Sequence, residues 1–126
     1  MKRLIAAILL LGTAVSVSVW TGHIFKVKMN GLLSSLDSVV DAAQTNSEDE
    51  LARKTDEIIL QWEKSSWILH SLVMHEGMDA VEENITALPL LLEHSDREEF
   101  KSKCIEAINQ IKNLLNAEKL NLENIL

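Results

Sequence analysis

The sequence predicts an all-α protein, with an N-terminal transmembrane or signal-anchor helix followed by a small antiparallel bundle of four helices. A long apolar segment follows two basic residues at the amino terminus. Beyond it, apolar residues recur at three- and four-residue spacing, which is the period of an amphipathic helix. Short turns separate the helical segments and favour antiparallel neighbours. Residues 29–126 are close to the usual size of one domain, so we expect a single core.

Residues 1–28 are predicted to form a membrane anchor. Lys2 and Arg3 precede the apolar segment, and residues 4–22 are just long enough to cross a lipid bilayer, which takes about 20 residues. The side chains expected at the membrane interface and the head groups are those of Trp20, Phe25, Lys26 and Lys28. The alternative is a cleaved signal peptide, which the basic start and small residues near Ser16 also fit. We favour the anchor, because no clean small-x-small cleavage site precedes a polar mature start.

Charge differs between the two regions. Residues 1–28 hold four basic and no acidic residues, whereas residues 29–126 hold eight basic and nineteen acidic residues, a formal charge of −11. Such an acidic domain lacks the basic patch that nucleic acid requires, which excludes that class of partner. Basic residues flank the apolar segment on both sides, so the positive-inside bias is slight. A short amino-terminal tail normally stays inside, which predicts a single-pass membrane protein with an extracytoplasmic bundle.

Cys104 is the only cysteine, so the chain has no internal disulfide. It lies on the apolar face of a predicted helix and is interpreted as a small core residue. A disulfide between two chains is the alternative if the bundle is extracytoplasmic. Asn84-Ile85-Thr86 matches a glycosylation acceptor sequence, which matters only in a eukaryotic secretory pathway.

Residues 29–45 are predicted to form the first helix of the bundle. No proline separates this helix from the anchor, so the two can form one long rod with Gly22 and Gly31 as soft points. Residues 44–47 form the turn into the next helix. The apolar stripe of the first helix consists of Met29, Leu32, Leu33, Leu36, Val39, Val40 and Ala43.

The helix predicted over residues 47–79 organises the bundle. Ser47 and Glu50 match a capping box at its start. One apolar face contains Leu51, Thr55, Ile58, Ile59, Trp62, Leu69, Leu72 and Val73. A second, nearly opposite face contains Leu60, Trp67 and Met74. A helix with two apolar faces is covered on both sides, so we expect this helix at the centre of the bundle, with Trp62 and Trp67 in the core.

The end of this helix carries the one segment that resembles a catalytic motif, His75-Glu76-Gly77-Met78-Asp79. Metalloproteases place two histidines around a glutamate on one helix face, and Asp79 stands in the place of the second histidine. Gly77 interrupts the helix as a C-cap, and Asp79 with Glu82 matches a second capping box. His70 is about 140° from His75 around the helix and cannot complete the site. We therefore predict no metal-ligating residue.

Two further helices complete the bundle. The third opens at Asp79 with Met78, Val81, Ile85, Leu88 and Leu92 on its apolar face. Pro89 should kink it or end its regular part, and residues 90–92 are expected to be buried. Ser95 and Glu98 match a third capping box. The fourth helix is predicted from Asp96 to about Leu115, closed by Asn116, and the tail over residues 120–126 is expected to dock on the bundle. Its stripe is Phe100, Cys104, Ala107, Ile108, Ile111, Leu114 and Leu115.

These residues resemble an uncharacterised family, domain of unknown function 4363. The resemblance lies in the tryptophan-bearing helix, in His75-x-x-Met78-Asp79-x-Val81, in the following helix pair and in the closing Leu-x-Leu-x-Asn-Ile-Leu of residues 120–126. With the anchor and the length, it extends over the whole chain. The family pattern reads His-x-Glu-Ile-Asp, and this chain has Gly77 where the glutamate stands, with Glu76 out of register. The resemblance implies a bacterial, membrane-anchored helical protein with no established activity.

No catalytic, cofactor-binding or metal-ligating residue is predicted, so the chain is expected not to be an enzyme. We interpret it as an interaction or sensory module at the cell envelope, with the bilayer bound through residues 4–22. A protein partner is expected at an exposed apolar patch that involves Ile68, Leu90 or the tail, and self-association is expected through the first helix. One alternative is a small-molecule-binding bundle with a cavity near Trp62, Trp67 and His70. A metal-dependent hydrolase using His75, Glu76 and Asp79 is the more distant alternative.

Overall fold

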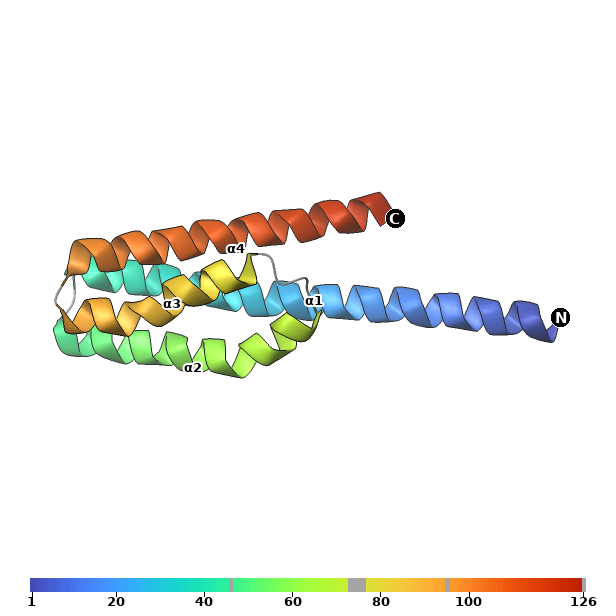
Figure 1. Cartoon of the computed structure of the whole chain (residues 1–126), viewed down its shortest axis with the longest axis horizontal. Coiled ribbons are helices and arrows are strands. Elements are labelled where there is room, and N and C mark those ends of the chain that lie inside the picture. Colours follow the sequence, from blue (N-terminus) through green and yellow to red (C-terminus); the bar gives the residue numbers. More distant parts are fainter. Residues whose placement is uncertain (46, 73–76, 95, 126) are drawn as a thin grey trace.

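The computed structural model describes residues 1–45, 47–72, 77–94 and 96–125, without the side chains of residues 70–72 and 121–125. These ranges contain four helices and no strand: α1 (Lys2–Thr45), α2 (Glu48–Leu72), α3 (Met78–Glu93) and α4 (Arg97–Ile125). Consecutive helices run in opposite directions, and α1 extends far beyond the other three at its amino-terminal end (Figure 1). The prediction of an all-α bundle behind a long apolar helix is confirmed.

Each helix packs against two neighbours. Helix α1 contacts α2 and α4, and α3 contacts the same two helices, whereas the described parts of α2 and α4 do not contact each other. The four helices therefore surround one core, and the prediction that α2 lies at its centre is wrong. The reason is that only one face of α2 is covered. Leu60 is 54% exposed and Trp67 is 68% exposed, and Met74 lies outside the described residues.

Four apolar stripes form the core. Trp62 is its largest fully buried side chain, and its indole Nε1 donates a hydrogen bond to Glu82 Oε1 on α3 at 3.4 Å. The indole thereby keeps a polar partner while its ring is removed from water. The most deeply buried apolar residues are Met29, Leu32 and Leu36 on α1, Leu51 and Leu69 on α2, Met78, Val81, Ile85 and Leu88 on α3, and Phe100, Cys104, Ala107 and Ile111 on α4.

Helix α1 is continuous through Gly22 and Gly31, which confirms that the apolar segment and the first helix of the bundle form one long helix. Its buried stripe begins earlier than residue 29, because Gly22 and Phe25 precede Met29 at helical spacing and are buried with it. Phe25 is 1% exposed, so its ring packs in the bundle core and does not face lipid, as an interface residue was expected to do. A ring that falls on the core stripe is buried by the neighbouring helices, whatever its distance from the apolar segment.

The helix starts agree with the capping patterns only in part. Ser47 Oγ accepts a hydrogen bond from the Glu50 amide at 3.4 Å, as predicted. Helix α3 begins after Gly77, which has a φ of 93° and makes no side-chain cap, so Asp79 lies within the first turn and does not cap it. Helix α4 is capped by Asp96, whose Oδ1 accepts from the Glu99 amide at 3.1 Å. The predicted cap at Ser95 lies outside the described residues.

Of the last two helices, only α4 is longer than predicted. Helix α3 continues through Pro89 to Glu93, and Leu90 is 57% exposed, so the expected burial all round that turn is wrong. Helix α4 passes Asn116 and reaches Ile125. No glycine or proline follows Asn116, so nothing in the sequence forces the helix to end there. Leu120, expected to dock on the bundle, is 59% exposed.

Candidate functional site

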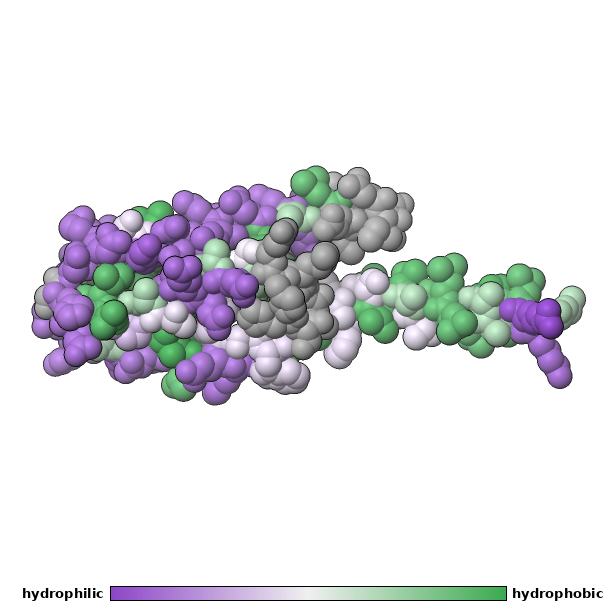
Figure 2. Space-filling model, viewed as in Figure 1, coloured by the Kyte–Doolittle hydropathy of each residue, from purple (hydrophilic) through white to green (hydrophobic). Residues whose placement is uncertain are grey.

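The amino-terminal part of α1 has no neighbours in the bundle. We call residues 2–20 the rod. Every residue of the rod is exposed, and Figure 2 shows its apolar surface projecting from a largely hydrophilic bundle. Among the described residues, α1 is the one helix that is long and apolar enough to cross a membrane. Its exposed large apolar side chains are those of Leu4, Ile5, Ile8, Leu9, Leu10, Leu11, Val15, Val17, Val19 and Trp20.

Two hydroxyl groups at the rod are satisfied within the helix. Thr13 Oγ1 donates a hydrogen bond to the Leu9 carbonyl at 2.8 Å, and Thr21 Oγ1 donates to the Ser18 carbonyl at 3.0 Å. In hydrocarbon, where water is absent, a polar group needs such an internal partner. These two side chains are therefore compatible with a lipid environment.

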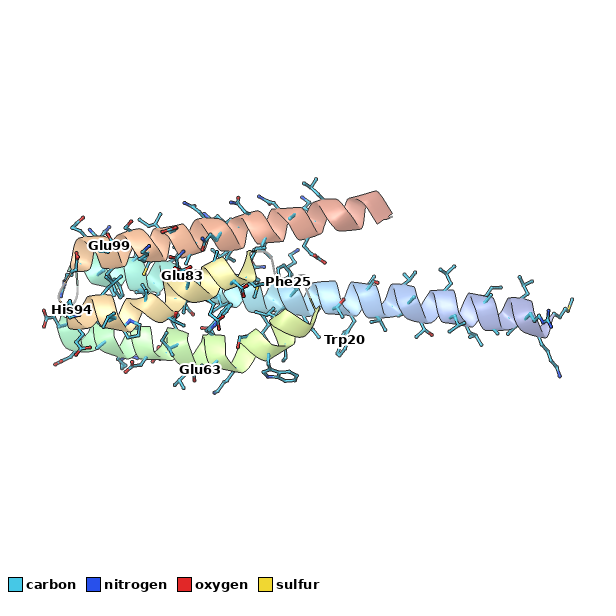
Figure 3. All side chains as sticks on the ribbon, viewed as in Figure 1. Trp20, Phe25, Glu63, Glu83, His94 and Glu99 are labelled. Carbon is cyan, nitrogen blue, oxygen red and sulfur yellow. The ribbon has the colours of Figure 1, made fainter. Side chains whose placement is uncertain are left out.

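A cavity lies where the rod enters the bundle. We call it the junction cavity; it has a volume of about 300 Å³ between α1 and the end of α4. Phe25 supplies a ring that points toward the bundle, whereas Trp20 projects from the rod (Figure 3). Lys26 and Lys119 are the two basic residues of its lining. The complete lining is Gly22, Phe25, Lys26, Asn30, Leu115, Asn116, Glu118 and Lys119.

A second cavity, of about 330 Å³, lies at the opposite end of the bundle. Four carboxylates line it, from Glu48, Asp49, Asp56 and Glu93, together with the guanidinium of Arg97. Arg97 Nη1 also donates a hydrogen bond to the Ala43 carbonyl at 3.2 Å, which joins the start of α4 to the end of α1. Within the described ranges, no group of three or more His, Cys, Asp or Glu side chains is placed to hold a metal ion.

The residues of the metalloprotease-like segment are not brought together by the described structure. Asp79 is exposed in the first turn of α3. His75 and Glu76 lie outside the described residues, and so does the side chain of His70.

Two of the three residues of the predicted tryptophan cavity are described by the structure, and the side chain of His70 lies outside it. Trp62 is 2% exposed and lies in the core, whereas Trp67 is 68% exposed. The two rings therefore occupy different environments on α2. The junction cavity has neither tryptophan in its lining, and its residues come from positions about ninety apart in the sequence.

Burial of two side chains excludes two modifications that the sequence left open, glycosylation at Asn84 and an interchain disulfide at Cys104. Asn84 is 5% exposed, and its Nδ2 donates to Gln110 Oε1 at 2.8 Å, so the glycosylation motif is not available in the folded chain. Cys104 is fully buried, and burial raises the pKa of its thiol from 9.0 to about 12. A thiol that is both inaccessible and protonated does not form a disulfide between folded chains.

A family model described as a domain of unknown function (DUF4363) matches residues 19–125. The chain belongs to the DUF4363 family. No curated protein and no solved structure matches the chain. The DUF4363 region begins beside Trp20 and contains the whole bundle and the junction cavity. It leaves out residues 1–18, so the family resemblance does not extend over the whole chain as expected.

Proposed function

We propose that this DUF4363 protein is a membrane-tethered, non-enzymatic module that positions or senses a partner at the cell envelope. The observation that carries the proposal is the unbroken path of α1 from the exposed apolar rod into the buried core. An exposed apolar surface of this length is unfavourable in water and marks a contact with lipid or protein. Its length and composition fit a lipid bilayer.

The attachment of α1 to its neighbours supports a rigid connection to the membrane. Ser35 Oγ donates to Gln61 Oε1 at 2.8 Å, and Lys54 Nζ donates to Ser38 Oγ at 2.7 Å, so side chains join α1 to α2 along its length. Gly31 lies inside this contact, where an added Cβ would be 3.1 Å from Gln61 Nε2. A tilt of the rod would therefore move the bundle with it, which suits a positioning or sensory role.

The outer face of α2 is the surface that we propose for a protein partner. Leu60 and Trp67 are two helical turns apart and are both more than half exposed. Large apolar side chains on a solvent-facing helix are typical of a contact site. The first helix, through which self-association was expected, already buries Met29, Leu32 and Leu36 within its own bundle. A second copy would therefore have to use another face, such as the outer face of α2.

We further propose that the bundle is extracytoplasmic, and a reactive thiol tests this orientation. Gln44 is exposed near the carboxyl end of α1, far from the rod, so Gln44→Cys provides an accessible thiol. The buried Cys104 should stay silent in intact protein, which makes the unsubstituted chain the matched control. Intact cells are treated with a membrane-impermeant thiol reagent and then fractionated.

We expect labelled, full-length Gln44→Cys protein in the membrane fraction and no label on the unsubstituted chain. Labelling only after cell lysis would show that the bundle is cytoplasmic. Recovery of the chain in the soluble fraction, in either labelling state, would contradict the membrane tether itself. The two parts of the proposal therefore fail in different ways.

A further inference from the structure

We propose that the junction cavity binds the headgroup phosphate of an anionic membrane phospholipid. This inference rests on the proposed membrane tether and goes beyond it, because a tether needs only the rod. The cavity has a volume of about 300 Å³. That is at the lower end of ligand pockets, roughly 300–1,000 Å³, and suits a headgroup better than a whole lipid.

The position of the cavity along α1 fits the depth of lipid headgroups. Gly22 is both the last residue of the predicted span over residues 4–22 and part of the cavity lining. Lys26 is four residues further on, about 6 Å along the helix axis at 1.5 Å per residue. The polar layer of a bilayer is roughly 5–8 Å thick on each side of its hydrocarbon core. Lys26 therefore lies within the headgroup layer when the rod spans the hydrocarbon.

Helix α4 brings the other half of the lining to the same depth. It runs antiparallel to α1, and its carboxyl end lies on the same side of the bundle as the rod (Figure 1). The helix continues for six residues beyond Lys119, to Ile125, which adds about 9 Å toward the membrane. The cavity thus lies between two helices that both continue in the direction of the lipid.

The charge of the lining complements a phosphodiester. Lys26 and Lys119 contribute two positive charges and Glu118 one negative charge, a formal balance of +1 in a domain whose residues 29–126 carry −11. This balance matches the single negative charge of a phosphodiester. Lysine is a common phosphate ligand, and basic residues near an anionic leaflet favour its binding.

The uncharged lining suits the remainder of a lipid headgroup. Asn30 and Asn116 are exposed residues of the lining and carry side-chain amide groups. Leu115 is half-buried and presents apolar surface, whereas Phe25 is 1% exposed and belongs to the buried side of the lining. Glycerol and the first methylenes of the acyl chains would cover Leu115 while the phosphate contacts the lysines.

The test compares two double variants of the full chain in lipid nanodiscs. Lys26→Gln with Lys119→Gln removes both cations of the cavity. Lys28→Gln with Lys112→Gln removes one cation from each of the same two helices, outside the lining, and is the matched control. The nanodiscs contain phosphatidylcholine alone or with phosphatidylglycerol. The phosphatidylglycerol that remains bound after detergent extraction is counted by native mass spectrometry.

We expect the cavity variant to bind phosphatidylglycerol about thirtyfold more weakly, because each basic residue near an anionic surface contributes roughly a factor of five. The control variant should lose far less, because Lys28 and Lys112 lie outside the cavity and farther from the rod than Lys26 and Lys119. Equal losses in both variants would indicate a general charge effect, and no loss in either would leave the cavity without a role; both results overturn the inference.

Inorganic phosphate is tested separately in nanodiscs of phosphatidylcholine alone. Binding of inorganic phosphate to the unsubstituted chain and not to the cavity variant would assign the cavity to free phosphate and overturn the inference too. Failure of all chains to enter nanodiscs would instead contradict the membrane tether.

Discussion

At the scale of single residues, burial decides the chemistry of this chain more than residue type does. Cys104 shows this most clearly, because a lone accessible thiol is a candidate for oxidation. Its complete burial removes access and raises the pKa of the thiol to about 12. The sequence predicted a small core residue from its place on an apolar stripe, and that prediction is confirmed.

The raised pKa of Cys104 has a consequence for stability at alkaline pH. The unfolded chain loses this proton near pH 9, whereas the folded chain retains it up to about pH 12. Folding stability that is present below pH 9 is therefore lost as the pH rises, with a slope that approaches about 1.4 kcal/mol per pH unit between pH 10 and pH 12. We expect urea unfolding at pH 8, 9 and 10 to show this decline.

The contribution of Cys104 is isolated by the variant Cys104→Ala. Other groups titrate in the same range, but they do so equally in both chains. The difference in unfolding free energy between the unsubstituted chain and Cys104→Ala should shrink by about 1 kcal/mol between pH 9 and pH 10, because the unfolded thiol is only half ionised at pH 9. A difference that stays constant over this range would show that the thiol is not desolvated in the folded state.

At the scale of helices, the three- and four-residue periodicity identified the buried stripes but not the neighbours of each helix. The stripe containing Leu51, Ile58, Trp62 and Leu69 is buried as predicted. Leu60 and Trp67 obey the same periodicity and are exposed, because periodicity reports that a face is apolar and not that another helix covers it. The end of α4 was missed for a related reason, since Asn116 permits a helix end without requiring one.

The start of α3 depends on the backbone of Gly77 and not on a side-chain cap. Its φ of 93° is a left-handed conformation that costs other residues roughly 1–2 kcal/mol. An added Cβ would also lie 2.8 Å from Leu114 Cδ2 on α4. We therefore expect Gly77→Ala to reduce the unfolding free energy by about 1–3 kcal/mol, as measured by urea unfolding.

Gly12→Ala is the matched control for this substitution. Gly12 lies in the rod, where an added Cβ meets nothing within 4 Å, so the bundle should unfold as before. An effect of Gly77→Ala no larger than that of Gly12→Ala would indicate that the entry into α3 does not require the left-handed conformation.

At the scale of the whole molecule, the boundary between anchor and bundle could not be read from hydropathy. The apolar segment and the core stripe are both apolar, and they overlap on one helix around Gly22 and Phe25. The junction cavity could not be predicted either, because it forms between segments about ninety residues apart. The lack of a glycine or proline after Asn116 was the one signal that α4 reaches this level.

Two shortened chains distinguish the boundary at residue 29 from one near residue 21. The chain over residues 21–126 lacks the rod and keeps every buried residue of α1, whereas residues 29–126 lack Gly22 and Phe25. Loss of a buried phenylalanine ring costs about 3–5 kcal/mol. We expect residues 21–126 to be soluble without detergent and to unfold cooperatively in urea, and residues 29–126 to be less stable by that amount. Equal stability of the two chains would place Phe25 outside the cooperative core. Aggregation of residues 21–126 would show that apolar surface other than the rod needs the membrane.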